Sequence, residues 1–222
     1  MKKNIRNHAF IAVVLTAITF TLSTFAIAQK HDGRANNFRS VRSIVTAGIT
    51  SANRMSYRIG TDFAMAIDDA KTMKDDNKSF NFTIVDLVYL IDELEGQSEA
   101  GQLQALLKGV IRGSRDLTAV SREIATISNS YLSRQAAEQK WYFNVGTSQM
   151  NLMMASWTKD STTVIKYTTD LQSLVKTAPL GTPPLVLESI KGLSKYAGMT
   201  LTVNDYSDLV EDAKMITTLV YA

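Results

Sequence analysis

The sequence has no cysteine, only two histidines and only three prolines among its 222 residues. Without cysteine, the chain can form neither a disulfide nor a thiolate metal site, so its stability must come from packing. No cysteine follows the apolar N-terminal run either, which excludes a lipid-anchored lipoprotein.

Scarce histidine excludes the commonest catalytic and metal-binding arrangements. His8 lies in the N-terminal segment, and His31 lies in the polar stretch after it. A Ser-His-Asp triad, a Cys-His pair and the Glu-x-x-His pairs of a di-iron bundle therefore cannot be built. There is no glycine-rich phosphate loop. Composition leaves a Ser–Lys dyad open, but no such pair is marked by its surroundings. We predict a protein that is not an enzyme and uses no cofactor or metal.

The first 28 residues have the layout of a secretory signal peptide. A basic start (Lys2, Lys3, Arg6) precedes an apolar and hydroxyl-bearing run over residues 9–25, which ends in Ala26-Ile27-Ala28. This predicts cleavage after Ala28 and a periplasmic or secreted protein of residues 29–222, without a stable membrane span. The alternative is an uncleaved anchor, because the run is nearly long enough to cross a bilayer.

The basic character of the whole chain comes from this segment. The sequence has 24 Lys and Arg against 21 Asp and Glu, and three of the basic residues lie within residues 1–28, which contain no acid. Residues 29–222 therefore carry no formal net charge, and their composition gives no reason to expect nucleic-acid binding.

Apolar and small residues recur at alternating intervals of four and three. One such seam spans residues 41–73 and is interrupted only by Asp62; another spans residues 106–131. This period is typical of helices that pack side by side. We predict an all-α protein: an elongated up-and-down bundle of long antiparallel helices, forming a single domain over residues 29–222.

Turn and capping signals divide this bundle into helices. The expected helices cover about residues 37–74, 83–96, 98–140, 147–177, 183–198 and 202–222. Capping boxes are predicted at Thr83 with Asp86 and at Thr202 with Asp205. A break is predicted just after residues 141–143, because three consecutive aromatic rings cannot share one helix face.

Methionines and aromatics in the fourth predicted helix and just before it are the candidate ligand-binding residues. These residues are Trp141, Tyr142, Met150, Met153, Met154 and Trp157. Together they could line a pocket for a small apolar ligand. Methionine at helical spacing is more often adaptable core filler, and its thioether can also hold copper(I). An exported binding protein for an apolar ligand is therefore our alternative hypothesis.

Arginines without neighbouring acids precede an acidic stretch. Arg39, Arg42, Arg54 and Arg58 fall opposite the first seam, where they could contact an anionic lipid or envelope polymer. The alternative is pairing with residues 62–95, which hold nine acids against three lysines. Our main hypothesis is an exported, non-catalytic protein that acts through its surface as a cell-envelope interaction or structural factor. Its partner would be a protein or envelope component, and a homo-oligomer is left open.

Overall fold

The computed structural model describes residues 49–72, 78–113 and 117–222, without the side chains of residues 117–118. Its elements are α3 (Ser51–Thr72), α4 (Lys78–Glu93), α5 (Gln97–Ile111), α6 (Leu117–Arg134), α7 (Ala137–Trp157), α8 (Ser161–Lys176), α9 (Pro184–Gly192), the 3₁₀ helix η2 (Leu193–Tyr196) and α10 (Val203–Tyr221). The all-α prediction is confirmed. No helix within the described ranges is long and apolar enough to cross a membrane. The predicted signal peptide and residues 41–48 of the first seam lie outside these ranges.

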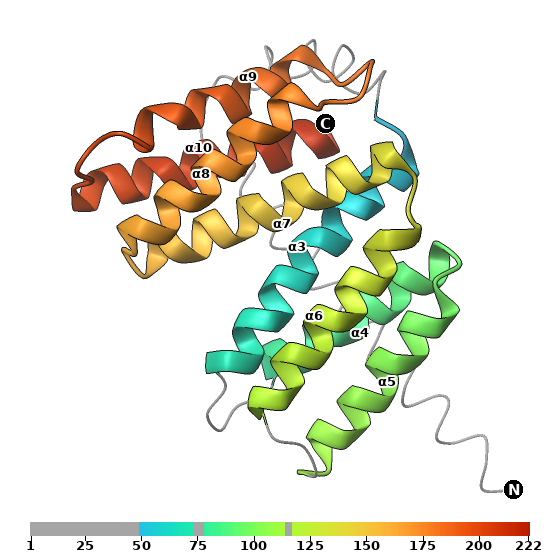
Figure 1. Cartoon of the computed structure of the whole chain (residues 1–222). Coiled ribbons are helices and arrows are strands. Elements are labelled where there is room, and N and C mark those ends of the chain that lie inside the picture. Colours follow the sequence, from blue (N-terminus) through green and yellow to red (C-terminus); the bar gives the residue numbers. More distant parts are fainter. Residues whose placement is uncertain (1–48, 73–77, 114–116) are drawn as a thin grey trace, which may run out of the picture. The chain divides into compact units, whose positions relative to one another are not determined.

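Helices α3 to α6 surround one apolar core and are called the first helix group below (Figure 1). Contacts join α3 to α4, α4 to α5, α5 to α6 and α6 back to α3, so the four helices form a closed ring around the core. The core includes Ile59, Phe63, Ile84, Leu87, Leu103, Leu106, Ile124 and Ile127. Burying each such side chain contributes about 1.5–3 kcal/mol, and this burial holds the group together without disulfides.

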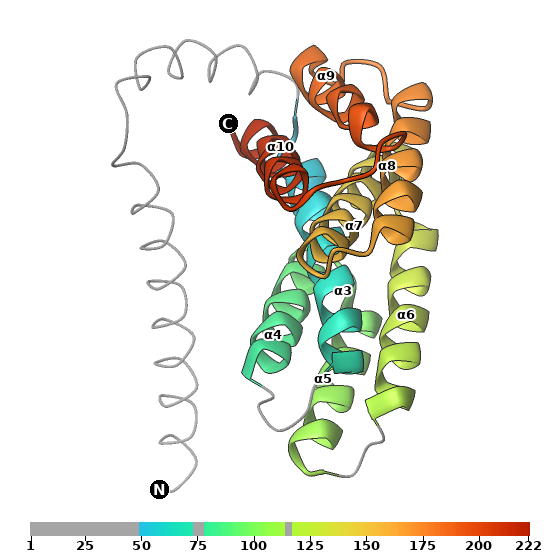
Figure 2. The ribbon, with the colours of Figure 1, turned by 90° about the vertical axis from the view of Figure 1, so that its left-hand side faces the viewer.

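Helices α7, α8, α9 and α10, together with η2, surround a second core and form the second helix group (Figure 2). Contacts join α7 to α8, α8 to α9, α9 to α10 and α10 back to α7. The core includes Trp141, Leu152, Val164, Leu171, Val186, Ile190, Leu209 and Ile216. The predicted capping box at the start of α10 is confirmed, because Asp205 N donates to Thr202 Oγ1 and Thr202 N donates to Asp205 Oδ2.

The two groups meet where α3 and α7 cross with their backbones in contact. A Cβ atom on Gly60 would overlap the carbonyl oxygen of Phe143, and one on Gly146 would overlap the carbonyl oxygen of Tyr57. Thr147 Oγ1 also donates to the carbonyl oxygen of Gly60 at 3.1 Å. Tyr57 of α3 packs in the second core and Phe143 of α7 packs in the first, so each helix serves both groups.

The long third helix predicted over residues 98–140 is wrong. The structure divides this stretch into α5, α6 and the start of α7. Gly113, after the end of α5, has a φ of +64°, a left-handed conformation that glycine adopts without strain. The seam residues Leu106, Val110, Val120 and Ile124 are nevertheless all buried, because α6 folds back over the core that α5 packs on.

The predicted break after residues 141–143 is also wrong, since α7 continues from Ala137 to Trp157. All three aromatic rings are buried because α7 lies between two cores: Trp141 and Tyr142 face the second, Phe143 the first. The chain turns instead at residues 158–160, where Lys159 has a φ of +57° and Asp160 caps α8 by accepting from Thr163 N. The predicted fourth helix is therefore split into the end of α7 and α8.

The predicted capping box at Thr83 is wrong because α4 begins five residues earlier, at Lys78. Thr83 is buried inside the helix, where its hydroxyl donates to the carbonyl oxygen of Ser79 at 3.0 Å. Asp86 is therefore not occupied with a helix end, and its carboxylate pairs with Arg58 across to α3.

The α3–α7 crossing predicts a large effect of single methyl groups. Gly60→Ala or Gly146→Ala should lower the free energy of unfolding by about 1–3 kcal/mol, because the helices must separate to admit the Cβ atom. Gly101→Ala in α5 is the matched control: nothing lies within 4 Å of the added Cβ. It should stabilise the protein by up to about 1 kcal/mol through helix propensity. Urea unfolding followed by circular dichroism measures all three; equal effects would contradict the close approach.

Candidate functional site

The six predicted ligand-binding residues all lie on α7, but they do not line one pocket. Trp141 and Tyr142 are buried in the second core, and Trp141 Nε1 donates to the carbonyl oxygen of Leu174 at 2.8 Å. Met153 is buried against Val210 and Ala213 of α10. Trp141 and Trp157 are 16 residues apart on one helix, or about 24 Å, too far to contact the same small ligand.

Met150, Met154 and Trp157 remain as one surface, which we call the Met–Trp face. Their spacing of four and three places them on one side of α7, in line with Phe143 and Gly146, which pack on α3. Beyond the crossing, this side of α7 is only partly covered: the two methionines are half-buried and the Trp157 side chain is 58% exposed. The face is therefore an apolar surface rather than a closed pocket.

A buried polar network holds this part of α7 in place. The Gln149 side-chain amide donates to the carbonyl oxygen of Ala213 at 2.7 Å and to Thr217 Oγ1 at 2.9 Å. Its oxygen accepts from the Tyr57 hydroxyl, which also contacts Thr217 Oγ1 at 2.7 Å. Burial raises the pKa of Tyr57 well above its usual value, so the ring stays a neutral donor. Sequence reasoning missed Gln149 and Tyr57, since neither falls in an apolar seam.

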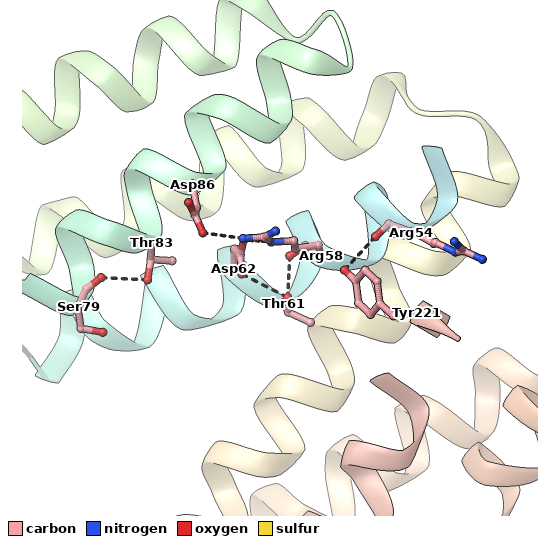
Figure 3. Close-up of polar contacts among 8 residues, drawn as sticks. All are labelled: Arg54, Arg58, Thr61, Asp62, Ser79, Thr83, Asp86 and Tyr221. Atoms are coloured by element: carbon pink, nitrogen blue, oxygen red, sulfur yellow. Dashed lines mark hydrogen bonds and ion pairs between the residues drawn. The ribbon is translucent and has the colours of Figure 1, made fainter. Parts of the chain in front are cut away.

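The predicted basic face is only partly described, because Arg39 and Arg42 lie outside the described residues. Figure 3 shows Arg58 between two carboxylates: its Nη2 lies 2.7 Å from Asp86 Oδ2 of α4, and its Nε lies 3.7 Å from Asp62 Oδ2. Arg58 is therefore paired with the acidic stretch, as the alternative interpretation had it. Arg54, one turn earlier, is half-buried, and its Nε has no hydrogen-bond partner among the described residues.

Asp62, the residue that interrupts the first seam, is short of partners. Its side chain is 14% exposed, and its Oδ2 atom is buried and accepts no hydrogen bond from any described residue. Thr61 Oγ1 approaches Oδ1 at 3.4 Å. Burial raises the pKa of the Asp62 carboxyl to about 7; Arg58 opposes this rise and Asp86 adds to it. One guanidinium thus serves two carboxylates, and we call these three side chains the Arg58 cluster.

The Arg58 cluster offers charge and hydrogen bonding rather than metal binding. Across the described ranges, no three His, Cys, Asp or Glu side chains gather in a way that could hold a metal ion. Tyr221 of the second helix group lies near the cluster: its ring packs edge-on against Tyr57, and its hydroxyl donates to the carbonyl oxygen of Arg54 at 3.4 Å. The cluster is therefore suited to electrostatic recognition at the surface of α3 and α4.

Comparisons of the chain with protein-family models, with curated proteins and with solved structures found no match.

The raised pKa of the Asp62 carboxyl predicts how stability depends on pH. The folded protein holds this proton up to about pH 7, whereas the unfolded chain releases it near 3.8. The contribution of Asp62 to stability should therefore fall as pH rises from about 4 to 7 and level off above, by up to about 4 kcal/mol. Asp62→Asn removes this contribution, so it should be increasingly more stable than the unsubstituted protein across that window. Urea unfolding at pH 4, 5.5, 7 and 8 measures the difference; parallel profiles would contradict the assignment.

Proposed function

We propose that the protein is an exported, non-catalytic, up-and-down helical bundle that binds another protein of the cell envelope through the Met–Trp face. The observation that carries this proposal is the exposure of Trp157 beside two methionines on a helix fixed by buried contacts. Tryptophan contributes strongly to binding at the centres of interfaces, and methionine adapts its shape to a partner.

The contrast between the two tryptophans supports a binding role for Trp157. Trp141 is buried, and its indole N–H has a backbone acceptor, so packing accounts for it fully. Trp157 is much more exposed than Trp141. A large ring that stays in water contributes little to the stability of the fold, so packing does not account for Trp157. A surface that adds methionine to an exposed tryptophan has the composition of a protein interface rather than of ordinary exposed surface.

The proposal differs from both site predictions made from the sequence. A small apolar ligand would need concave walls, but the residues expected to form them are divided between the second core and the surface. An anionic surface would need several unpaired arginines, but Arg58, one of the two described, is already shared between Asp62 and Asp86. A protein partner needs neither, because it can cover an open apolar face.

Export itself gives a direct prediction. Protein recovered from outside the cytoplasm of the source organism should begin at Gln29, since cleavage after Ala28 fits the small-residue pattern that signal peptidase reads. Edman sequencing or intact-mass measurement checks this. An N-terminus at Met1 in that fraction would contradict cleavage, and an intact protein fixed in the membrane would favour an uncleaved anchor.

The two tryptophans make a matched pair of variants. Trp141→Ala should lower the free energy of unfolding by about 3–5 kcal/mol, because it empties a packed site. Trp157→Ala should lower it by less than about 1 kcal/mol, because the ring is mostly in water. Denaturant unfolding measures both values. A large loss from Trp157→Ala would show that the ring is a packing residue.

Binding can be tested at the same position. A photo-reactive amino acid at position 157 should cross-link in cells to a discrete partner, and one at the exposed position 138, near the start of α7, should not. Position 154 should give the same product as position 157. The absence of a product at both 154 and 157, or the same product at 138, would overturn the proposal.

A further inference from the structure

The outer side of α4 carries a second, chemically different surface. Phe82 and Tyr89 are 56% and 64% exposed, so no described helix covers them. Asp86 and Glu93 lie on the same side, and the four residues follow each other at intervals of four, three and four. This is the spacing of the buried seams, here left open to solvent. We call it the α4 face.

Charge is strongly one-sided around this face. The described residues 62–72 and 78–95, which form the second half of α3, α4 and the turn after it, have seven acids against two lysines. The Arg58 side chain of α3 forms ion pairs with two of these carboxylates, Asp86 at 2.7 Å and Asp62 at 3.7 Å. A buried carboxylate oxygen without a hydrogen bond is costly. Among the described residues, the Arg58 cluster therefore has one cation for two carboxylates.

We propose that the α4 face binds a basic amphipathic helix of a partner protein, which supplies the cation that the Arg58 cluster lacks. A lysine or arginine of the partner pairs with Asp86, and Arg58 moves to Asp62, whose buried oxygen then gains a donor. The spacing of Phe82 and Tyr89 matches the apolar stripe of a helix. Both rings can also receive cations over their faces.

Binding of such a helix changes the protonation of Asp62, which a simple attraction between surface charges would not do. The charged and titratable groups near Asp62 are Arg58 on α3, Asp86 on α4 and Tyr221 on α10. When Arg58 moves to Asp62, the carboxyl is held in its ionised form, because a close positive charge favours that form. A carboxyl that is partly protonated near pH 7 in the free protein therefore loses its proton on binding.

The test uses a synthetic peptide of about 18 residues built from leucine and lysine at helical spacing; its leucine–glutamate counterpart is the charge control. Isothermal titration at pH 7 should show binding of the lysine peptide only. Phe82→Ser combined with Tyr89→Ser, and separately Asp86→Asn, should each weaken it by about tenfold or more. Ile111→Ser, which removes an equally exposed apolar residue of α5, should not weaken it.

Isothermal titration in two buffers of different ionisation enthalpy measures how many protons are released on binding. At pH 7, binding should release about half a proton from the unsubstituted protein, because the Asp62 carboxyl is about half protonated there. It should release none from Asp62→Asn, which should still bind. Equal affinity for all variants, no binding of the lysine peptide, or equal proton release by Asp62→Asn would each overturn the proposal. Trp157→Ala should bind the peptide normally, so failure here and failure of the Met–Trp face can be told apart.

Discussion

Backbone contact between α3 and α7 at Gly60 and Gly146 is the constraint on which the rest of the structure depends. Because neither glycine carries a side chain at the crossing, the two helices come close enough for carbonyl oxygens to fill the space that Cβ atoms would take. Each helix then has one side turned to each core, as Tyr57 and Phe143 show. The two helix groups are joined by shared helices, and separating α3 from α7 would open both cores.

This arrangement also decides which surfaces are left for binding. Helix α3 is covered by α4, α6 and α7, and it presents little apolar surface of its own. Exposed apolar side chains include Trp157 on α7 beyond the crossing and Phe82 and Tyr89 on the outer side of α4. Both helices are anchored along their inner sides, so a partner would meet preformed surfaces. Binding to a rigid surface loses less conformational entropy than binding to a mobile one.

Periodicity predicted the all-α class and much of the burial, because the seam residues Ile59, Ala66 and Ile124 are buried. It could not predict the lengths of the helices. Two shorter helices that fold back on each other, α5 and α6, bury the same residues that one straight helix would bury. The role of Gly60 and Gly146 at the crossing was not predicted either. In a sequence, a glycine within a helix resembles a helix break unless the helix that packs against it is known. Helical spacing places Met150, Met154 and Trp157 on one side of a helix, but how deeply each side chain is buried depends on where α3 stops covering α7.

Asp62 is where the sequence departs furthest from what packing alone favours. An apolar residue there would complete the first seam, and replacing a buried ionic group by a packed apolar one is often stabilising. The structure instead places a carboxyl beside a guanidinium that is already bound to Asp86, and one carboxyl oxygen accepts no hydrogen bond from the described residues. Stability gives no reason for that choice, whereas recognition does, because an incompletely paired cluster gains most from an incoming cation. Positions that break a folding rule without local compensation are where function is expected.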